Sequence, residues 1–151
     1  MHAICYNYHM NVQKVIKELK EKYPNGNIIE NKNSQGITTE IICEVITSQK
    51  NPDESRAIAV IDSSVIHYHK VITETYKVLK GNFTVIKYTA EKKIFEEIEL
   101  NAGDFVVMKP GELHSNIGKE TWVEVVSTPA WFIEDFINLD ILLKKYTSKD
   151  K

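Results

Sequence analysis

Short segments rich in Ile, Val, Thr, Tyr and Phe recur from about Ile37 onward, and turn-forming residues separate them. The breaks include Gly81-Asn82 and Pro110-Gly111, which favour turns. We predict strands at 37–46, 56–61, 64–69, 74–80, 83–89, 94–99, 105–109, 113–117 and 121–127. Strands this short and this regularly spaced predict an all-β antiparallel sandwich or barrel, such as a jelly roll. The absence of helical patterns between them argues against a doubly wound α/β fold.

Two segments flank this β-rich region. Apolar residues recur at helical spacing from Asn11 to Tyr23, and Pro24-Asn25-Gly26 ends that pattern. The tail after Pro129 is apolar to about Leu143, and we predict that it is partly helical. Its apolar residues are expected to cover one barrel opening or to contact a partner subunit: Trp131, Phe132, Phe136, Ile137 and Leu142. We therefore divide the chain into an N-terminal helix and connection (1–35), a β-barrel (36–129) and a C-terminal segment (130–151).

The composition argues against several classes of protein. The chain has 151 residues, the length of one domain. A net charge of −2 and a single arginine, Arg56, give no basic surface for nucleic acid. We expect no signal peptide, because MHAICYNYHM has no positive stretch followed by an apolar run, and no membrane span, because no apolar run approaches roughly 18 residues. Cys5 and Cys43 match no CxxC pattern, so we expect a cytoplasmic protein with reduced thiols.

Two of the five histidines, His67 and His69, are separated by one residue in a β-rich segment. Because side chains alternate between the faces of a strand, both imidazoles point to one side, roughly 6–7 Å apart. Glu74 follows His69 by five residues, and an odd separation places it on the opposite face of a regular strand. It joins the histidines only if a turn or bulge between Val71 and Thr73 resets the alternation. A metal site here therefore predicts a break in the strand.

A histidine far along the chain is the fourth candidate ligand. The segment GDFVVMKPGELHSNIG (103–118) begins with a turn, continues as a short strand and turns again at Pro110-Gly111. His114 follows Gly111 by three residues. A tight turn just before a histidine holds that side chain in a fixed direction.

These two segments resemble the paired motifs of the cupin superfamily. HYHKVITETYKVLKG (67–81) is similar to the first motif, H-x-H, three or four residues, E, six residues, G. GDFVVMKPGELH (103–114) resembles the second, G, five residues, P-x-G, two residues, H. The matching residues are His67, His69, Glu74, Gly81, Gly103, Gly111 and His114. The resemblance covers about residues 55–127 and implies a single cupin barrel and a homodimer.

A few positions depart from these motifs. Ile61-Asp62 stands where a glycine usually precedes the first histidine, and Lys109 stands where the second motif has a proline. Gly118 replaces an asparagine that usually follows the last histidine by four residues, while Asn116 follows it by two. These departures alter turns rather than ligands.

The resemblance implies that His67, His69, Glu74 and His114 bind one divalent transition metal: Mn, Fe, Ni, Co or Zn. An octahedral ion would keep two positions for water or substrate. A site charge of about +1 then favours a bidentate oxygen ligand such as an α-hydroxy carbonyl, an enediolate or a carboxylate.

Two further residues are candidates for contact with a small-molecule substrate. Tyr76 follows Glu74 by two residues and shares its face, so it either fills the pocket wall or acts as an acid, base or substrate contact. Lys109 is either a surface charge or a partner for an anionic substrate group.

The expected function is that of a metal-binding cupin, and three interpretations of it stay open. The first motif resembles small single-domain cupins related to mannose-6-phosphate isomerase, which favours an isomerase or epimerase acting on a sugar or sugar phosphate. A mononuclear Fe(II) dioxygenase is the second interpretation. A non-catalytic domain that binds a metal or a small molecule is the third.

Overall fold

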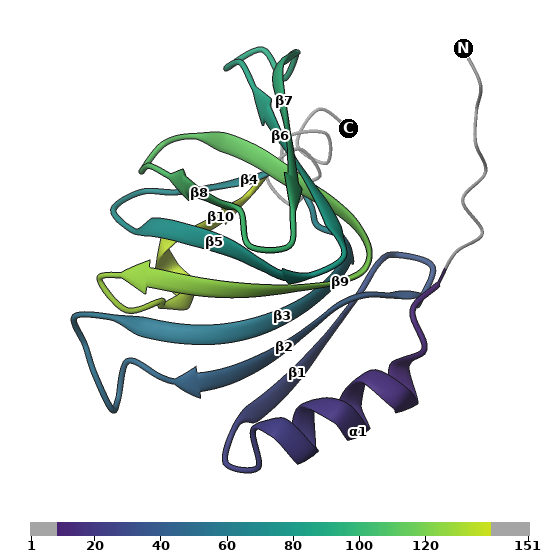
Figure 1. Cartoon of the computed structure of the whole chain (residues 1–151). Coiled ribbons are helices and arrows are strands. Elements are labelled where there is room, and N and C mark those ends of the chain that lie inside the picture. The colour runs from purple at the N-terminus through teal and green to yellow at the C-terminus, as the bar shows by residue number, and fades with distance from the viewer. Residues whose placement is uncertain (1–8, 140–151) are drawn as a thin grey trace, which may run out of the picture.

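One helix packs against the outside of a curled antiparallel β-sheet (Figure 1). The structure is a computed structural model, and it describes residues 9–139. Its elements are α1 (Val12–Lys22), β1 (Asn27–Lys32), β2 (Thr38–Ile46), β3 (Ser55–Ser63), β4 (His67–His69), β5 (Thr73–Lys80), β6 (Asn82–Tyr88), β7 (Ile94–Asn101), β8 (Phe105–Met108), β9 (Leu113–Thr128), the short 3₁₀ helix η1 (Ile133–Asp135) and β10 (Phe136–Asn138).

The long strand β9 organises the sheet. Its first half pairs with β6 and, at His114, with β4, while its second half pairs with β3 and β5. The strands β1, β2 and β3 follow in order on one side, β8 pairs with β5, and β7 pairs with β6. β9 has partners on both edges along its length, and the sheet around it is strongly curled (Figure 1).

Two apolar cores lie on the two faces of the curled sheet. Alternation along β2 directs Ile41 and Cys43 outward, where Val15 and Leu19 of α1 cover them. The inner core fills the closed part of the barrel with buried side chains that include Tyr76, Val78, Phe83, Val85, Met108 and Val123. The side chains on the inner face of β2 line the part of the barrel that this core does not fill.

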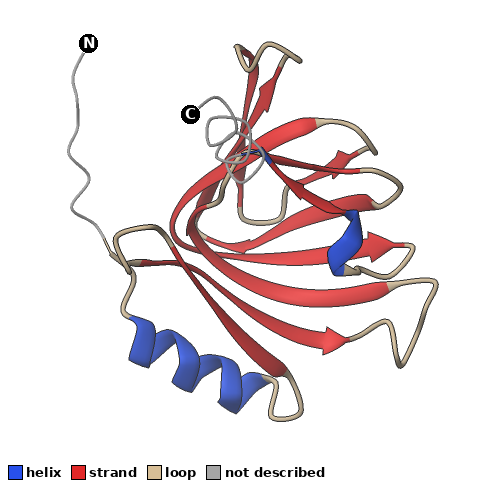
Figure 2. Ribbon diagram, turned by 180° about the vertical axis from the view of Figure 1, so that it is seen from behind, coloured by secondary structure: helices blue, strands red, loops and turns tan. Residues whose placement is uncertain are grey.

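Helix α1 begins and ends as its sequence predicts. The Asn11 side chain accepts a hydrogen bond from the backbone N–H of Lys14 at 3.2 Å, as an N-cap does. The helix ends at Lys22, just before Pro24. Figure 2 shows α1 and η1 at separate places on the sheet. Within residues 9–139, neither helix has the length and apolarity that a membrane span needs.

Three elements differ from the sequence-based prediction. Residues 27–32 form β1, which pairs with β2, where the sequence was interpreted as a connection. The predicted strands 113–117 and 121–127 are one strand, β9, with a register shift against β3. Among residues 130–138 the helical element is η1, and β10 follows it beside β4. Leu142 and the rest of the predicted tail helix lie outside the described residues.

Gly118 allows β9 to continue through this irregular stretch. A Cβ at this position would lie 2.6 Å from the Ile61 carbonyl oxygen and 2.6 Å from Thr121 Oγ1. We expect Gly118→Ala to lower the free energy of unfolding by about 1–3 kcal/mol, because the backbone of β3 cannot retreat without breaking ladder hydrogen bonds. Urea denaturation followed by circular dichroism measures this. An unchanged midpoint would show that the neighbouring strands adjust freely.

Candidate metal centre

Strand β4 presents two imidazoles to the inside of the barrel. His67 and His69 are buried, while Tyr68 between them is half-buried and faces the other side. β4 is fixed on both edges: His67 pairs with His114 of β9, and His69 pairs with Phe136 of β10. Both histidines therefore share one face, as their spacing predicts.

The predicted break between the histidines and Glu74 is present. β4 ends at His69 and β5 begins at Thr73, so a loop resets the alternation. The Asp135 carboxylate accepts hydrogen bonds from the backbone N–H groups of Val71 and Ile72, both at 3.0 Å. The Asp135 carboxylate of η1 therefore stabilises the loop between β4 and β5, from which β5 continues as the next strand.

Glu74 and Tyr76 then point into the barrel from β5. Their positions are buried and alternate with the half-buried Thr73 and Thr75. His114 reaches the same place from β9, after the turn at Gly111, whose φ of 84° favours glycine. The Gly111 N–H also donates to the His69 carbonyl at 2.7 Å, which ties that turn to β4.

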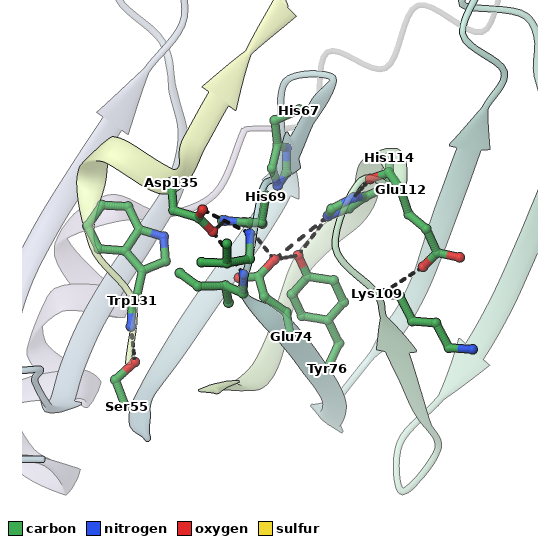
Figure 3. A network of polar contacts seen from close by, with 12 residues as sticks. Ser55, His67, His69, Glu74, Tyr76, Lys109, Glu112, His114, Trp131 and Asp135 are labelled. Atoms are coloured by element: carbon green, nitrogen blue, oxygen red, sulfur yellow. Dashed lines mark hydrogen bonds and ion pairs between the residues drawn. The ribbon is translucent and has the colours of Figure 1, made fainter. Parts of the chain in front are cut away.

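Four side chains converge at one point (Figure 3). Glu74 Oε1 lies 3.0 Å from His69 Nε2 and 3.8 Å from His114 Nε2. The rings of His67 and His114 are 4.2 Å apart between centroids. Ligand atoms of His67, His69 and Glu74 all lie within 4.8 Å of one another, so these three residues form a group that can hold a metal ion. His114 adjoins this group.

The hydrogen bonds of two rings place the lone pair on their inward nitrogens, as a metal ligand requires. His67 Nδ1 lies 2.8 Å from the Val65 carbonyl oxygen, and His114 Nδ1 lies 2.9 Å from the Glu112 carbonyl oxygen. Carbonyl oxygens only accept, so each Nδ1 carries the proton and donates it. In the neutral ring the lone pair is then on Nε2, and a metal ligand requires that lone pair.

Burial sets the charges of the group. Desolvation, followed by the neighbouring His114, lowers the pKa of His67 to about 3, and desolvation also lowers the pKa of His114. Desolvation alone would raise the pKa of Glu74, but the His69 hydrogen bond and the surrounding imidazoles together lower it. Near neutral pH, His67 and His114 are therefore neutral and Glu74 is an anion.

The lowered pKa of His67 predicts an acid-labile apoprotein. Between pH 6.5 and about 3, the unfolded chain binds a proton at His67 that the folded chain does not bind, so stability rises with pH across this window. We expect the unfolding free energy of metal-free protein to fall by about 2 kcal/mol more in the wild type than in His67→Gln between pH 7 and pH 5. Urea titrations with a chelator present measure this. Parallel pH profiles would contradict the lowered pKa.

The donor set fits a divalent transition metal. The single Tyr76 hydroxyl proton faces two acceptors, Glu74 Oε1 at 2.7 Å and His114 Nε2 at 3.0 Å, so one of these lone pairs has no proton. Two ligands about 2.1 Å from one ion and at right angles to each other lie about 3 Å apart. The 3.0 Å between His69 Nε2 and Glu74 Oε1 matches this spacing.

Asp135 is a buried residue of the site that the sequence analysis missed. It is 2% exposed, and its Oδ2 lies 3.6 Å from His69 Nδ1, which is buried without a hydrogen-bond partner. A carboxylate behind a ligating histidine orients the ring and increases its basicity. Its only signal in the sequence is an acidic residue within an apolar segment, WFIEDFIN.

The structure brings Tyr76 into the group but does not bring Lys109 there. Burial, Glu74 and its hydrogen bond raise the pKa of Tyr76 well above 10, so the phenol stays protonated. Lys109 is exposed, follows the end of β8 and directs its side chain away from the histidines (Figure 3). Its backbone N–H is held by the Glu112 carboxylate at 2.7 Å, in the turn that precedes His114.

A pocket opens above the metal group on the inner face of the sheet. Its volume is about 390 Å³, and its walls come from β1, β2, β3, β4, β5, β9 and the C-terminal segment. His67, His69 and Glu74 lie in its lining. The tail residues Trp131, Ile133 and Phe136 form part of one wall.

No protein-family model matches the sequence, and no curated protein matches it either. Solved structures do resemble the fold. Pac13 from Streptomyces, a nucleoside dehydratase, has a TM-score of 0.62 at 14% identity, over 77% of this chain and 86% of Pac13.

Oxalate decarboxylases are similar to a comparable degree. A Bacillus subtilis variant has a TM-score of 0.63 at 17% identity, over 78% of this chain and 31% of that chain. The Lactobacillus farciminis formate complex has 0.62 at 17% identity, over 83% and 40%. At these identities the likeness concerns architecture alone. The protein therefore has the cupin fold, a single β-barrel with one N-terminal helix.

Proposed function

We propose that the protein is a metal-dependent enzyme that acts on a small molecule. The observation that carries this proposal is the convergence of three imidazoles and one carboxylate, of which His67, His69 and Glu74 line a pocket of about 390 Å³ and His114 lies beside Glu74. His67, His69, Glu74 and His114 are the proposed ligands, and Mn, Fe, Ni, Co and Zn are the candidate metals.

The favoured reaction class is isomerisation or epimerisation of an α-hydroxy carbonyl compound. When bound, the metal would supply a Lewis acid that polarises a carbonyl oxygen. The chain supplies the rest: a walled pocket that limits access of water, and the protonated Tyr76 hydroxyl as a hydrogen-bond donor beside the group. Similar folds include a nucleoside dehydratase and an oxalate decarboxylase, and both of these proteins act on small molecules.

Metal binding is the first test of this proposal. Protein stripped with a chelator and titrated with each candidate metal is expected to bind one ion per chain, and His67→Ala is expected to lose that binding. His9→Ala is the matched control, because His9 is exposed and lies outside the group. If no candidate metal binds, or if His67→Ala binds as the wild type does, the proposal is wrong.

An Fe(II) dioxygenase is the second candidate function, and the apolar surroundings of the group favour it. Phe136 packs on His67 with ring centroids 4.9 Å apart, and Ile61 and Val125 also line the pocket. Such walls keep water from a reactive site. Substrate-dependent oxygen uptake by iron-loaded protein would select this function. Metal and ligand binding without turnover would instead indicate a non-catalytic binding domain.

The homodimer and the cytoplasmic location stay predictions. Light scattering of the full chain tests the former, and a mass corresponding to one chain would contradict it.

A further inference from the structure

Much of the pocket wall is apolar, which is unusual for a site that binds a free sugar. The apolar side chains come from four strands and the C-terminal segment: Ile29, Ile42, Ile46, Ala57, Ala59, Ile61, Val125, Trp131, Ile133 and Phe136. An apolar wall gains free energy by covering apolar ligand surface, and the polar side chains of the same pocket, among them Asn116 and Glu40, can pair with ligand oxygens. A ligand that fits therefore has an apolar body as well as oxygens for the metal group.

A polar atom in the same pocket lacks a partner. Asn116 lines the pocket and is 3% exposed, and its Oδ1 is one of two buried side-chain polar atoms without a hydrogen bond among residues 9–139. The Asn116 side chain lies close enough to the Tyr76 phenol to oppose the rise in the pKa of Tyr76. A buried carbonyl oxygen of this kind costs free energy until a donor arrives. A ligand hydroxyl beside the metal group would be such a donor.

A carboxyl group outside the metal group lines the same pocket. Glu40 lies on the inner face of β2, half-buried, and Asn31 Nδ2 of β1 donates to its Oε2 at 3.2 Å. Arg56, on neighbouring β3, is paired with Glu124 at 2.7 Å. Burial raises the pKa of Glu40 to about 7; the Asn31 hydrogen bond opposes this, and the Glu74 charge adds to it. Such a carboxyl group gives and takes protons near neutral pH.

We infer that the pocket binds an α-hydroxy carbonyl compound with an apolar body, that Asn116 Oδ1 accepts its hydroxyl, and that Glu40 transfers the proton at its α-carbon. This inference rests on the proposed function and adds to it a substrate class and a base. The Glu40 carboxylate removes the proton, so the C–H bond breaks and an O–H bond forms on Glu40. The electron pair becomes the C=C bond of an enediolate, with the charge on the former carbonyl oxygen. The proton of the α-hydroxyl group then moves to the former carbonyl oxygen, and Glu40 returns its proton to the former carbonyl carbon. The new carbonyl group forms on the former α-carbon, which completes the isomerisation.

The first test needs no metal and no turnover. In full-length protein labelled with ¹³C at the glutamate carboxyls and stripped of metal, the signal that Glu40→Gln removes is expected to titrate near pH 7. A midpoint near 4.5, the ordinary value for glutamate, would overturn the role of Glu40 as base.

The second test uses metal-loaded protein and 2-hydroxyacetophenone, an α-hydroxy ketone with an aromatic body. We expect the wild type to bind this probe more tightly than dihydroxyacetone and to exchange its CH₂ protons in D₂O, followed by NMR. Glu40→Gln should still bind the metal and the probe, but its exchange of the CH₂ protons should be slower by about 100-fold or more. Asn116→Ala should weaken probe binding about three- to tenfold. Glu97→Gln, on exposed β7, is the matched control.

The outcomes separate this inference from the proposed function. If Glu40→Gln exchanges the probe's CH₂ protons as fast as the wild type, the inference is wrong while metal binding stands. The same holds if the wild type binds dihydroxyacetone more tightly than 2-hydroxyacetophenone. Metal-loaded protein that binds neither probe, or binds without exchange, also overturns it. If no metal binds at all, the proposed function is the part that is wrong, and the carboxyl titration still decides the pKa of Glu40.

Discussion

Glu74→Gln is expected to lower metal affinity by more than about 100-fold. Glu74 is the anion among the proposed ligands, and its Oε1 lies within 3.8 Å of the Nε2 atoms of both His69 and His114. The amide keeps the shape of the side chain but removes its charge, and substitutions behind a ligand already cost 10–100-fold. Isothermal titration of chelator-stripped protein with each candidate metal measures the loss.

A matched carboxyl-to-amide change elsewhere controls for general effects. Glu97→Gln replaces an exposed glutamate of β7, far from the pocket lining, and is expected to bind metal as the wild type does. Circular dichroism of both variants checks that the barrel folds. Equal metal affinities for the wild type and Glu74→Gln would show that Glu74 is not a ligand, and that its role is the structural hydrogen bond with Tyr76.

Asp135→Ala is expected to affect both stability and metal binding. The change removes the acceptor for the buried Ile72 N–H and the part-buried Val71 N–H. An unpaired buried group costs about 1–3 kcal/mol and a part-buried one costs less, so we expect a loss of about 2–5 kcal/mol in unfolding free energy. The same change leaves His69 without a carboxylate behind it, and we expect metal affinity to fall about 10–100-fold.

Urea denaturation without metal and metal titration of the folded variant measure the two effects separately. Glu134→Ala is the control, because the neighbouring carboxylate is exposed. Asp135→Asn retains one acceptor oxygen and should lose less stability than the alanine variant. A normal unfolding midpoint in Asp135→Ala would show that water replaces the carboxylate at the loop.

The sequence predicts most of the barrel because short strands and turns are local features. The spacing of the HxH pair also predicts that both histidines lie on one face of their strand. The odd separation of Glu74 from His69 predicts a loop between them, and the structure has that loop. β1 was missed because NIIENK has few apolar residues and is exposed except at Ile28. β9 was divided in two because Gly118 and the positive φ of Glu120 mark an irregularity that the ladder absorbs.

Other residues of the site could not be predicted because their roles depend on contacts distant in sequence. Asp135 acts on a loop 63 and 64 residues away, and no spacing rule connects the two segments. Glu40 lies in a strand whose alternation shows which face it shares, but not what that face lines. The sequence left two roles open for Lys109, a surface charge or a substrate contact, because its motif position does not fix where the side chain points; in the structure it is exposed and points away from the histidines (Figure 3).

The central position of β9 has a consequence for how the site is assembled during folding. Its partners begin at Ser55, paired with Ser127, and His67 meets His114 only across this strand. Pairings between residues this far apart in sequence require closure of long loops, which makes them slow to form. The histidines of β4 therefore emerge well before the strand that completes their surroundings. Until β9 is in place, the chain lacks His114, and we expect the proposed metal site to form late in folding.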